Sequence, residues 1–373
     1  MDINNEENVN QEEPSLLNQG TFGCIYKPEF SCNNKPFSSN PFKKKMVSKI
    51  TNINSNITQE IELGKFIQTI PYYDKYFAPI LNTCPINIGE INQEELQACQ
   101  FIQNELQQQQ KKNNSPPIYN SNTIRFVGQN SLYNVLYNSS FPKILTTHIH
   151  LLKALTLLQT SLDDPIIHYD LKENNIIFDD IYSIPIIIDF GISFLSSKLK
   201  SIDKDSFYVY YEKYAPWCIE IVIISYIVHN IDNRNMTLTD QDISKLKSIC
   251  SIFVKKNPIF ENGFYTDELL EFENNLLLFM DSFVSKNWND LIQILVSNHL
   301  SWDNYSLAGI YHAIIFKWSS LYDVDSIDFN NIKPFLVVYI KIIKDILLST
   351  PLSQRLKPQE TQKLLIELGT YKI

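Results

Sequence analysis

Residues 168–175 (HYDLKENN) and 189–191 (DFG) constrain the fold and the chemistry of this chain more than any other part of its sequence. They place an Asp, a Lys, an Asn and a second Asp on two neighbouring turns. The apolar residues 186–188 predict a strand that ends at Asp189, and Gly191 allows the backbone to turn sharply there. Asp and Asn are also ordinary turn formers. Two accidental polar loops are therefore the alternative, which the presence of both motifs at this separation disfavours.

The residue types in these turns match the needs of phosphoryl transfer. A Ser or Thr hydroxyl is a poor nucleophile, so a carboxylate such as Asp170 that accepts its proton accelerates the reaction, by about 10²–10⁴-fold for general bases. Lys172 can balance charge on a moving phosphate. Asn175 and Asp189 offer oxygen ligands of the kind that Mg²⁺ takes together with substrate phosphates.

The two motifs resemble the catalytic loop and the magnesium motif of the eukaryotic-type protein kinase family. The resemblance implies that Asp170 is the catalytic base and that Lys172 neutralises the transferring phosphate. It further implies that Asn175 and Asp189 bind Mg²⁺, with Mn²⁺ as an alternative ion. Lys172, two residues after the base, is similar to the Ser/Thr-specific pattern, and His168 would brace the loop.

The nucleotide side of such a site is expected upstream. Residues 20–26 (GTFGCIY) are similar to the last part of the family's Gly-rich loop, and Asn18 stands where its first glycine would be. Because Asn tolerates left-handed backbone better than most residues, this departure weakens the motif without abolishing it.

Residues 47–50 (VSKI) resemble the strand that carries the family's nucleotide-binding lysine. That lysine would be Lys49, with Glu60 preferred to Glu62 as its partner; a surface lysine in a basic patch is the alternative. The residues that the resemblance assigns to ATP are Asn18, Gly20, Thr21, Phe22, Gly23, Ile25, Lys49, Glu60, Arg125 and Val127.

Three later landmarks also fit the resemblance. Residues 214–220 (YAPWCIE) resemble the end of an activation segment, and Asp303 resembles the buried Asp that anchors the catalytic loop. Arg355 stands where the family has an arginine that pairs with the segment-end glutamate, here Glu220. Tyr169 departs from the pattern, because an Arg commonly precedes the base. Control by a phosphate bound at that pocket is therefore disfavoured, and constitutive activity or another switch is favoured.

The implied fold is α+β and bilobal, like a protein kinase, with a small mainly β lobe and a large mainly α lobe. We expect a disordered tail over 1–14, the small lobe over 15–127 and the large lobe over 128–373. Inserted loops are expected at about 28–45 and 97–118, and a long helical insertion at about 221–300. Apolar spacing predicts helices over 58–70, over 93–112 with fraying at its end, and just before His168; residues 124–127 predict a strand.

Composition and charge exclude some classes of binding partner and some cellular locations. A net charge of −9 argues against a nucleic-acid binder held by phosphate contacts. The apolar runs at 219–228 and 335–348 are shorter than the roughly 20 residues that span a bilayer, so both predict buried helices. With no apolar leader, we expect a cytoplasmic protein whose thiols are reduced. A disulfide between Cys24 and Cys32 is the disfavoured alternative.

The sequence therefore predicts a monomeric, ATP- and Mg²⁺-dependent Ser/Thr protein kinase acting on protein substrates. A pseudokinase scaffold working through the helical insertion and a small-molecule phosphotransferase are the alternatives. The insertion, Trp217, the pair Trp302-Asp303 and residues 79–86 resemble divergent kinases of giant nucleocytoplasmic DNA viruses. That source would place the protein in the host cytoplasm or the virion; an AT-rich protist is the rival source.

Overall fold

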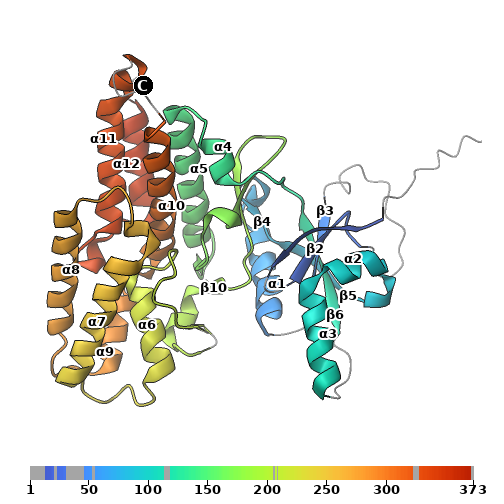
Figure 1. The fold of residues 1–373 in the computed structure, drawn as a ribbon, viewed down its shortest axis with the longest axis horizontal. Helices are drawn as coiled ribbons and strands as arrows, with labels where there is room; N and C mark the ends of the chain where they lie inside the picture. The colour runs from blue at the N-terminus through green and yellow to red at the C-terminus, as the bar shows by residue number, and fades with distance from the viewer. Residues whose placement is uncertain are drawn as a thin grey trace, which may run out of the picture. The chain divides into compact units, whose positions relative to one another are not determined.

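The computed structural model describes residues 13–20, 23–30, 46–52, 55–112, 118–204, 206–207, 209–321 and 327–370. The chain divides into two compact units, one within residues 1–69 and 78–127 and the other within 70–77 and 128–373. As predicted, the architecture is α+β: an N-terminal antiparallel sheet is followed by a largely helical region (Figure 1).

The first unit is built on a five-stranded antiparallel sheet of order β1-β2-β3-β6-β5. Gly23 begins β2 at a point of close approach to β3, because a Cβ there would lie 2.4 Å from the carbonyl oxygen of Ile50. The strands are β1 (Ser15–Gly20), β2 (Gly23–Lys27), β3 (Met46–Asn52), β5 (Ile80–Ile86) and β6 (Tyr119–Arg125).

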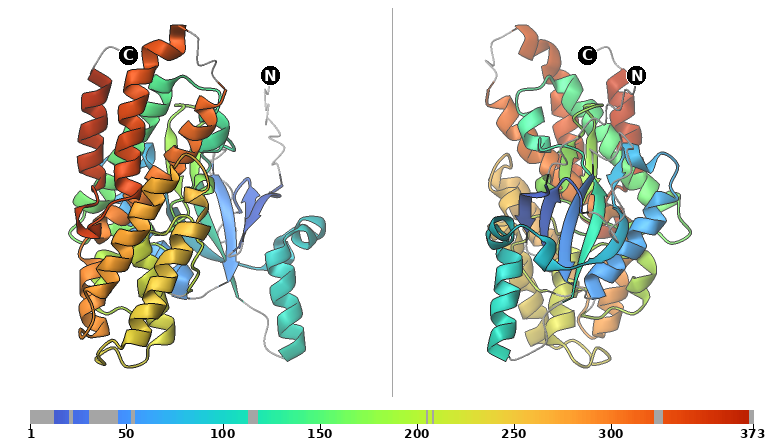
Figure 2. Two further views of the ribbon diagram at one scale, coloured as in Figure 1. Left: turned by 60° about the vertical axis from the view of Figure 1, so that its left-hand side comes forward. Right: turned by 90° about the vertical axis from the view of Figure 1, so that its right-hand side faces the viewer.

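Helices flank this sheet at both edges. Helix α1 (Ser55–Gln68) packs on β5, whereas α2 (Gln93–Ala98) and α3 (Gln100–Lys112) pack on β1 and β2. The right-hand view of Figure 2 shows α1 in blue and the α2–α3 pair in teal on opposite sides of the strands. The helix predicted over 93–112 is present as α2 and α3, interrupted at Cys99, and it falls within the segment expected as an insertion at about 97–118.

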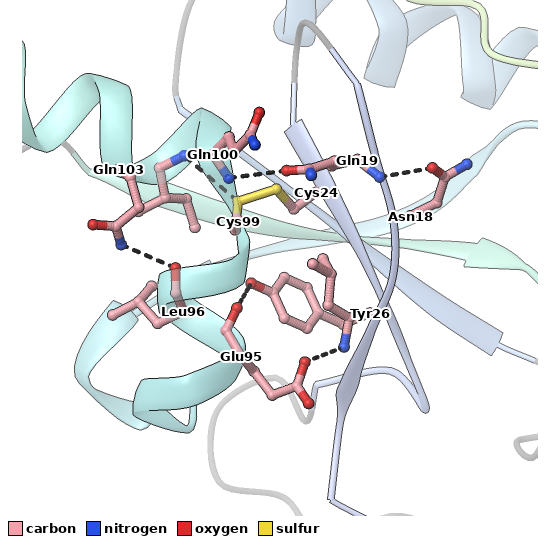
Figure 3. The surroundings of a disulfide bond; sticks show 11 residues. Asn18, Gln19, Cys24, Tyr26, Glu95, Leu96, Cys99, Gln100 and Gln103 are labelled. Atoms are coloured by element: carbon pink, nitrogen blue, oxygen red, sulfur yellow. Dashed lines mark hydrogen bonds between the residues drawn. A yellow bond between two sulfur atoms is a disulfide. The ribbon is translucent and has the colours of Figure 1, made fainter.

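Cys99, between α2 and α3, is disulfide-bonded to Cys24 of β2 (Figure 3). The prediction of reduced thiols is therefore wrong for this pair. Sequence spacing could not suggest it, since 75 residues separate the two cysteines and only the packing of α2–α3 on the sheet brings them together. Cys32, the partner considered from the sequence, lies outside the described residues.

The second unit is organised around α5 (Phe141–Thr160) and α10 (Trp302–Ser319). Helix α10 is buried on almost every side over its first fourteen residues, which explains why it carries apolar and aromatic residues all round. Helices α11 (Ile327–Leu347) and α12 (Pro358–Thr370) pack beside them, and α4 (Leu132–Leu136) precedes α5. Short strands complete the unit: β4 (Phe77–Ala78), which lies at the division between the units, β7 (Ile166–Ile167), β8 (Ile176–Phe178), β9 (Pro185–Ile188) and β10 (Phe194–Leu195).

The block predicted to be a helical insertion is helical. It contains α6 (Ile219–Asn230), α7 (Asp240–Lys256), α8 (Thr266–Asp281) and α9 (Trp288–Val296). The two apolar runs fall in α6 and in α11. Helix α6 is buried, as predicted, whereas α11 buries only one face and leaves Val337 and Val338 60% and 47% exposed, so the prediction of a buried helix is wrong for α11. Across the helices that the structure describes, none has the length and apolarity needed to cross a bilayer.

Candidate functional site

Loop 168–175 connects β7 to β8 and carries the predicted base. Asp170 is buried, and its Oδ2 accepts hydrogen bonds from Lys172 Nζ at 2.8 Å and from Asn175 Nδ2 at 3.1 Å. The same Nδ2 donates to the backbone oxygen of Asp170 at 2.8 Å. These bonds use the amide nitrogen of Asn175, so its Oδ1 is the atom that could bind a cation.

Asp189 follows β9 on the adjoining turn, as predicted. Three contacts join that turn and its flanking residues to loop 168–175: His168 Nε2 lies 3.1 Å from the carbonyl oxygen of Ile188, Ser193 Oγ donates to the His168 oxygen at 2.9 Å, and the rings of His168 and Phe190 are 5.1 Å apart. His168 therefore braces the two turns that carry the predicted site. Its contacts agree with the structural role expected for it.

Two non-glycine residues in these turns adopt left-handed backbone. Tyr169 has φ of 68° and Asp189 has φ of 62°. Such conformations cost of order 1–3 kcal/mol and persist where the surroundings enforce them. At Tyr169 the enforcing group is Asp303, at the start of α10, whose Oδ2 and Oδ1 accept from the backbone nitrogens of His168 and Tyr169 at 2.8 and 2.9 Å.

Asp303 is fully enclosed. Burial raises the pKa of its carboxyl, while His168 and the two amide donors oppose that rise. The contact that the sequence predicted for Asp303 is thus present, and it fixes the backbone on which Asp170 stands.

Tyr169 fills the position where the resemblance expected an Arg. Its ring is buried against Phe194, Phe207 and Trp217, with ring centroids 5.2, 5.7 and 5.1 Å away. Trp217 Nε1 also donates to the backbone oxygen of Tyr169 at 3.0 Å. Aromatic packing therefore holds the residue before the predicted base. Unlike an Arg at this position, Tyr169 has no positive charge that could bind a phosphate group.

Tyr214 belongs to this site, and the sequence did not single it out. Its hydroxyl donates to Asp170 Oδ1 and accepts from Lys172 Nζ at 3.2 Å. Only its place in residues 214–220 hinted at a role. The chain has many tyrosines, and nothing in the sequence distinguishes this one. Only the fold places it next to the predicted base, which lies 44 residues earlier in the chain.

Glu220 and Arg355 form the predicted pair. Arg355 donates from NH1 to Oε1 at 2.6 Å and from NH2 to Oε2 at 2.9 Å, and each side chain is 1% exposed. Burial alone would lower the pKa of Arg355, but the Glu220 carboxylate outweighs it and raises the pKa above its ordinary value. This bidentate pair anchors the end of residues 214–220.

In the first unit, Lys49 of β3 pairs with Glu60 of α1. Its Nζ lies 3.1 Å from both carboxylate oxygens, and both residues are buried. Glu62 is exposed. Burial therefore decides between the two glutamates in favour of Glu60, and the surface-lysine alternative for Lys49 is wrong.

The β1–β2 hairpin carries the predicted phosphate loop. Asn18 pairs with Ile25 and Gly20 with Gly23, while Thr21 and Phe22 lie outside the described residues. Asn18 sits within β1 rather than in left-handed backbone, so the tolerance invoked for it is not needed. Of the remaining predicted ATP contacts, Arg125 ends β6 and Val127, buried, follows it.

The donor set suits a hard cation. Asn175 and Asp189 supply oxygen atoms, which Mg²⁺ combines with waters and nucleotide phosphates. Within the residues that the structure describes, no group of three His, Cys, Asp or Glu side chains could hold a metal ion unaided. No protein-family model and no curated protein matches the chain.

Proposed function

We propose that this chain is an ATP-dependent Ser/Thr protein kinase with a bilobal, kinase-like fold, which transfers the γ-phosphate of Mg-ATP to hydroxyls of protein substrates. The observation that carries the proposal is the set of contacts at Asp170. A buried carboxylate is bound by Lys172 and Asn175, and its backbone is fixed by Asp303. Phosphoryl transfer by this route needs little more from the protein than positioning and charge.

Each residue has a defined task in the proposed reaction. Asp170 accepts the proton of the attacking hydroxyl, and Lys172 balances charge at the transferring phosphate. Asn175 and Asp189 would hold Mg²⁺, which when bound neutralises charge on the nucleotide phosphates. Lys49, oriented by Glu60, would bind the nucleotide phosphates together with the backbone around Gly20 and Gly23.

The aromatic packing of Tyr169 bears on control. An activation-segment phosphate needs a cationic pocket to bind, and the position before the base holds a buried ring instead. The proposed kinase is therefore active without a phosphate at that pocket.

The test is transfer of labelled phosphate from ATP, with Mg²⁺, to a generic basic protein. We expect Asp170→Asn to reduce transfer by about 10²–10⁴-fold, because it removes the proton acceptor while keeping the side chain's size. Asp163→Asn, at an exposed position, is the matched control. Equal activity of wild type and Asp170→Asn would exclude the role of Asp170, and nucleotide binding without any transfer would favour the pseudokinase scaffold.

A further inference from the structure

A cavity of about 490 Å³ opens beside loop 168–175 in the second unit. Leu171, Lys172 and Glu173 of the loop form one side of it, and Ala215 and Pro216 form another. The remaining walls come from α10, from Tyr133 of α4, and from Pro258, Ile259 and Asn262 of the helical block. The insertion thus contributes directly to a cavity at the proposed acceptor site.

The wall from the helical block is firmly held. Ile259 packs on Gly309 of α10 so closely that a Cβ at residue 309 would lie 2.6 Å from its Cδ1. Asn257 Oδ1 accepts from the Ile259 nitrogen at 3.0 Å. Phe260 is buried, with its ring 5.6 Å from that of Phe253. The cavity is therefore a formed pocket with a fixed wall.

The charges at the pocket favour neither sign of charged occupant. Among the described residues that line it, Glu173 is the one carboxylate and Lys172 and Lys317 carry the ammonium groups, but Lys172 Nζ already forms an ion pair with Asp170 at 2.8 Å. The rest of the lining is largely apolar, with Ile259, Ile310, Ala313 and Phe316, so an uncharged apolar side chain suits it.

The pocket adjoins the proposed acceptor position. Lys172 lines it, and the Nζ of this lysine is 2.8 Å from Asp170 Oδ2. A substrate chain with its hydroxyl at Asp170 would therefore have its neighbouring residues near the pocket. Since an extended chain advances about 3.3 Å per residue, a side chain within about four residues of the acceptor can reach it.

We infer that this pocket binds an aliphatic or aromatic side chain close to the Ser or Thr acceptor of the substrate, and that the helical insertion thereby sets substrate preference. The inference rests on the proposed function, because it takes the occupant to be a substrate. Ala313 is the residue through which it is tested, since it lines the pocket from an exposed position on α10, where a larger side chain leaves the core undisturbed.

The probes are fluorescein-labelled nonapeptides with a central Ser in a Gly-Ala background, in which one Leu occupies each other position in turn. Binding to the full chain is followed by fluorescence anisotropy, which requires no phosphate transfer. We expect one position at which Leu tightens binding at least tenfold over Ala. Ala313→Glu should abolish that gain and favour Lys at the same position, whereas Leu278→Glu, exposed on α8, should retain the preference for Leu.

Binding that is independent of the position of Leu would overturn the inference, as would an Ala313→Glu protein that still prefers Leu. The two proposals fail separately. Transfer to a generic protein without any Leu preference overturns the pocket's role and leaves the kinase standing. A Leu preference lost in Ala313→Glu, in a chain without transfer activity, supports the pocket's specificity and overturns the kinase.

Discussion

At the scale of single residues, the carboxylate of Asp170 shows how contacts rather than residue types define a site. Lys172 and Asn175 donate to one of its oxygens and Tyr214 donates to the other. Two of these partners lie within five residues of the base, and the third is 44 residues away. In the proposed reaction, Tyr214 would be a positioning residue that acts through the orientation of Asp170 and Lys172.

The Tyr214→Phe substitution tests this positioning role. It removes one hydroxyl and keeps the ring, which packs 4.9 Å from that of Trp217. Because a hydrogen bond to a charged group contributes about 1.5–3 kcal/mol, we expect kcat to fall at least tenfold, with the KM for protein substrate nearly unchanged. Steady-state kinetics at saturating ATP measures kcat and the KM for protein substrate separately.

Tyr211→Phe is the control for the Tyr214 experiment, since Tyr211 is 54% exposed. A Tyr214→Phe enzyme that is more active than wild type would contradict the positioning role. It would show instead that the tyrosine hydroxyl competes with the acceptor for Asp170.

At the scale of elements, α2 and α3 act as a clamp on the β1–β2 hairpin. The Cys24–Cys99 disulfide is one link (Figure 3), and the Gln100 nitrogen donates to Gln19 Oε1 at 2.9 Å. Glu95 adds two more links, one to the Leu16 nitrogen at 2.5 Å and one to the Tyr26 hydroxyl at 3.2 Å. The hairpin that carries Gly20 and Gly23 is therefore supported from outside the sheet.

Removing the disulfide should destabilise the first unit. Cys99→Ser deletes a cross-link between residues 75 apart in sequence, which constrains the unfolded chain. We expect the free energy of unfolding to fall by about 2–4 kcal/mol, measured by urea denaturation without reductant. Cys24→Ser should lower the free energy of unfolding by a similar amount. The double variant should be at least as stable as the less stable of the two single variants, because both substitutions remove the same bond. Wild type and Cys99→Ser that unfold alike, with and without dithiothreitol, would contradict this prediction.

At the scale of the whole molecule, each unit has its own core, and the core of the second contains a buried histidine. His148 stacks on Tyr311 with ring centroids 3.9 Å apart, and its Nδ1 lies 2.7 Å from the Tyr339 hydroxyl. Burial lowers the pKa of His148 to about 3. Protonation of this ring is therefore much less favourable in the folded protein than in the unfolded chain.

This histidine predicts acid sensitivity of the fold. Between about pH 6.5, the ordinary pKa of histidine, and pH 3, the unfolded chain binds a proton that the folded protein does not. Stability is thus complete above pH 6.5 and falls as the pH decreases, by about 2 kcal/mol at pH 5 from this residue.

His148→Phe should flatten the dependence of the unfolding free energy on pH between 5 and 7, measured by urea denaturation. Its curve should run parallel to that of wild type above pH 7.5, which serves as the internal control. His312, whose pKa burial lowers to about 4, leaves a smaller slope in the variant. An unchanged slope would show that His148 is not the titrating group.

Local features of the chain were predictable because neighbours in sequence create them. The helical character of α1, α5 and residues 221–300 follows from apolar spacing, and the turns at Asp170 and Asp189 follow from their own residues. The Asp303 contact and the Glu220–Arg355 pair were expected only through the family resemblance. The predicted strand at 124–127 overlaps β6 only at residues 124 and 125: pairing with β3 and β5 extends β6 back to Tyr119, and residues 126 and 127 lie beyond its end.

The sequence by itself determined the α+β class, the helical character of residues 221–300 and the placement of Asp170, Lys172, Asn175 and Asp189 on two adjoining turns. Only the tertiary structure decided for Glu60 over Glu62, joined Cys24 to Cys99, brought Tyr214 to the base and formed the pocket beside it. The physical reason is the distance along the chain over which each effect acts. Propensity and periodicity act between near neighbours, whereas burial, disulfide bonding and side-chain contact depend on how distant segments pack.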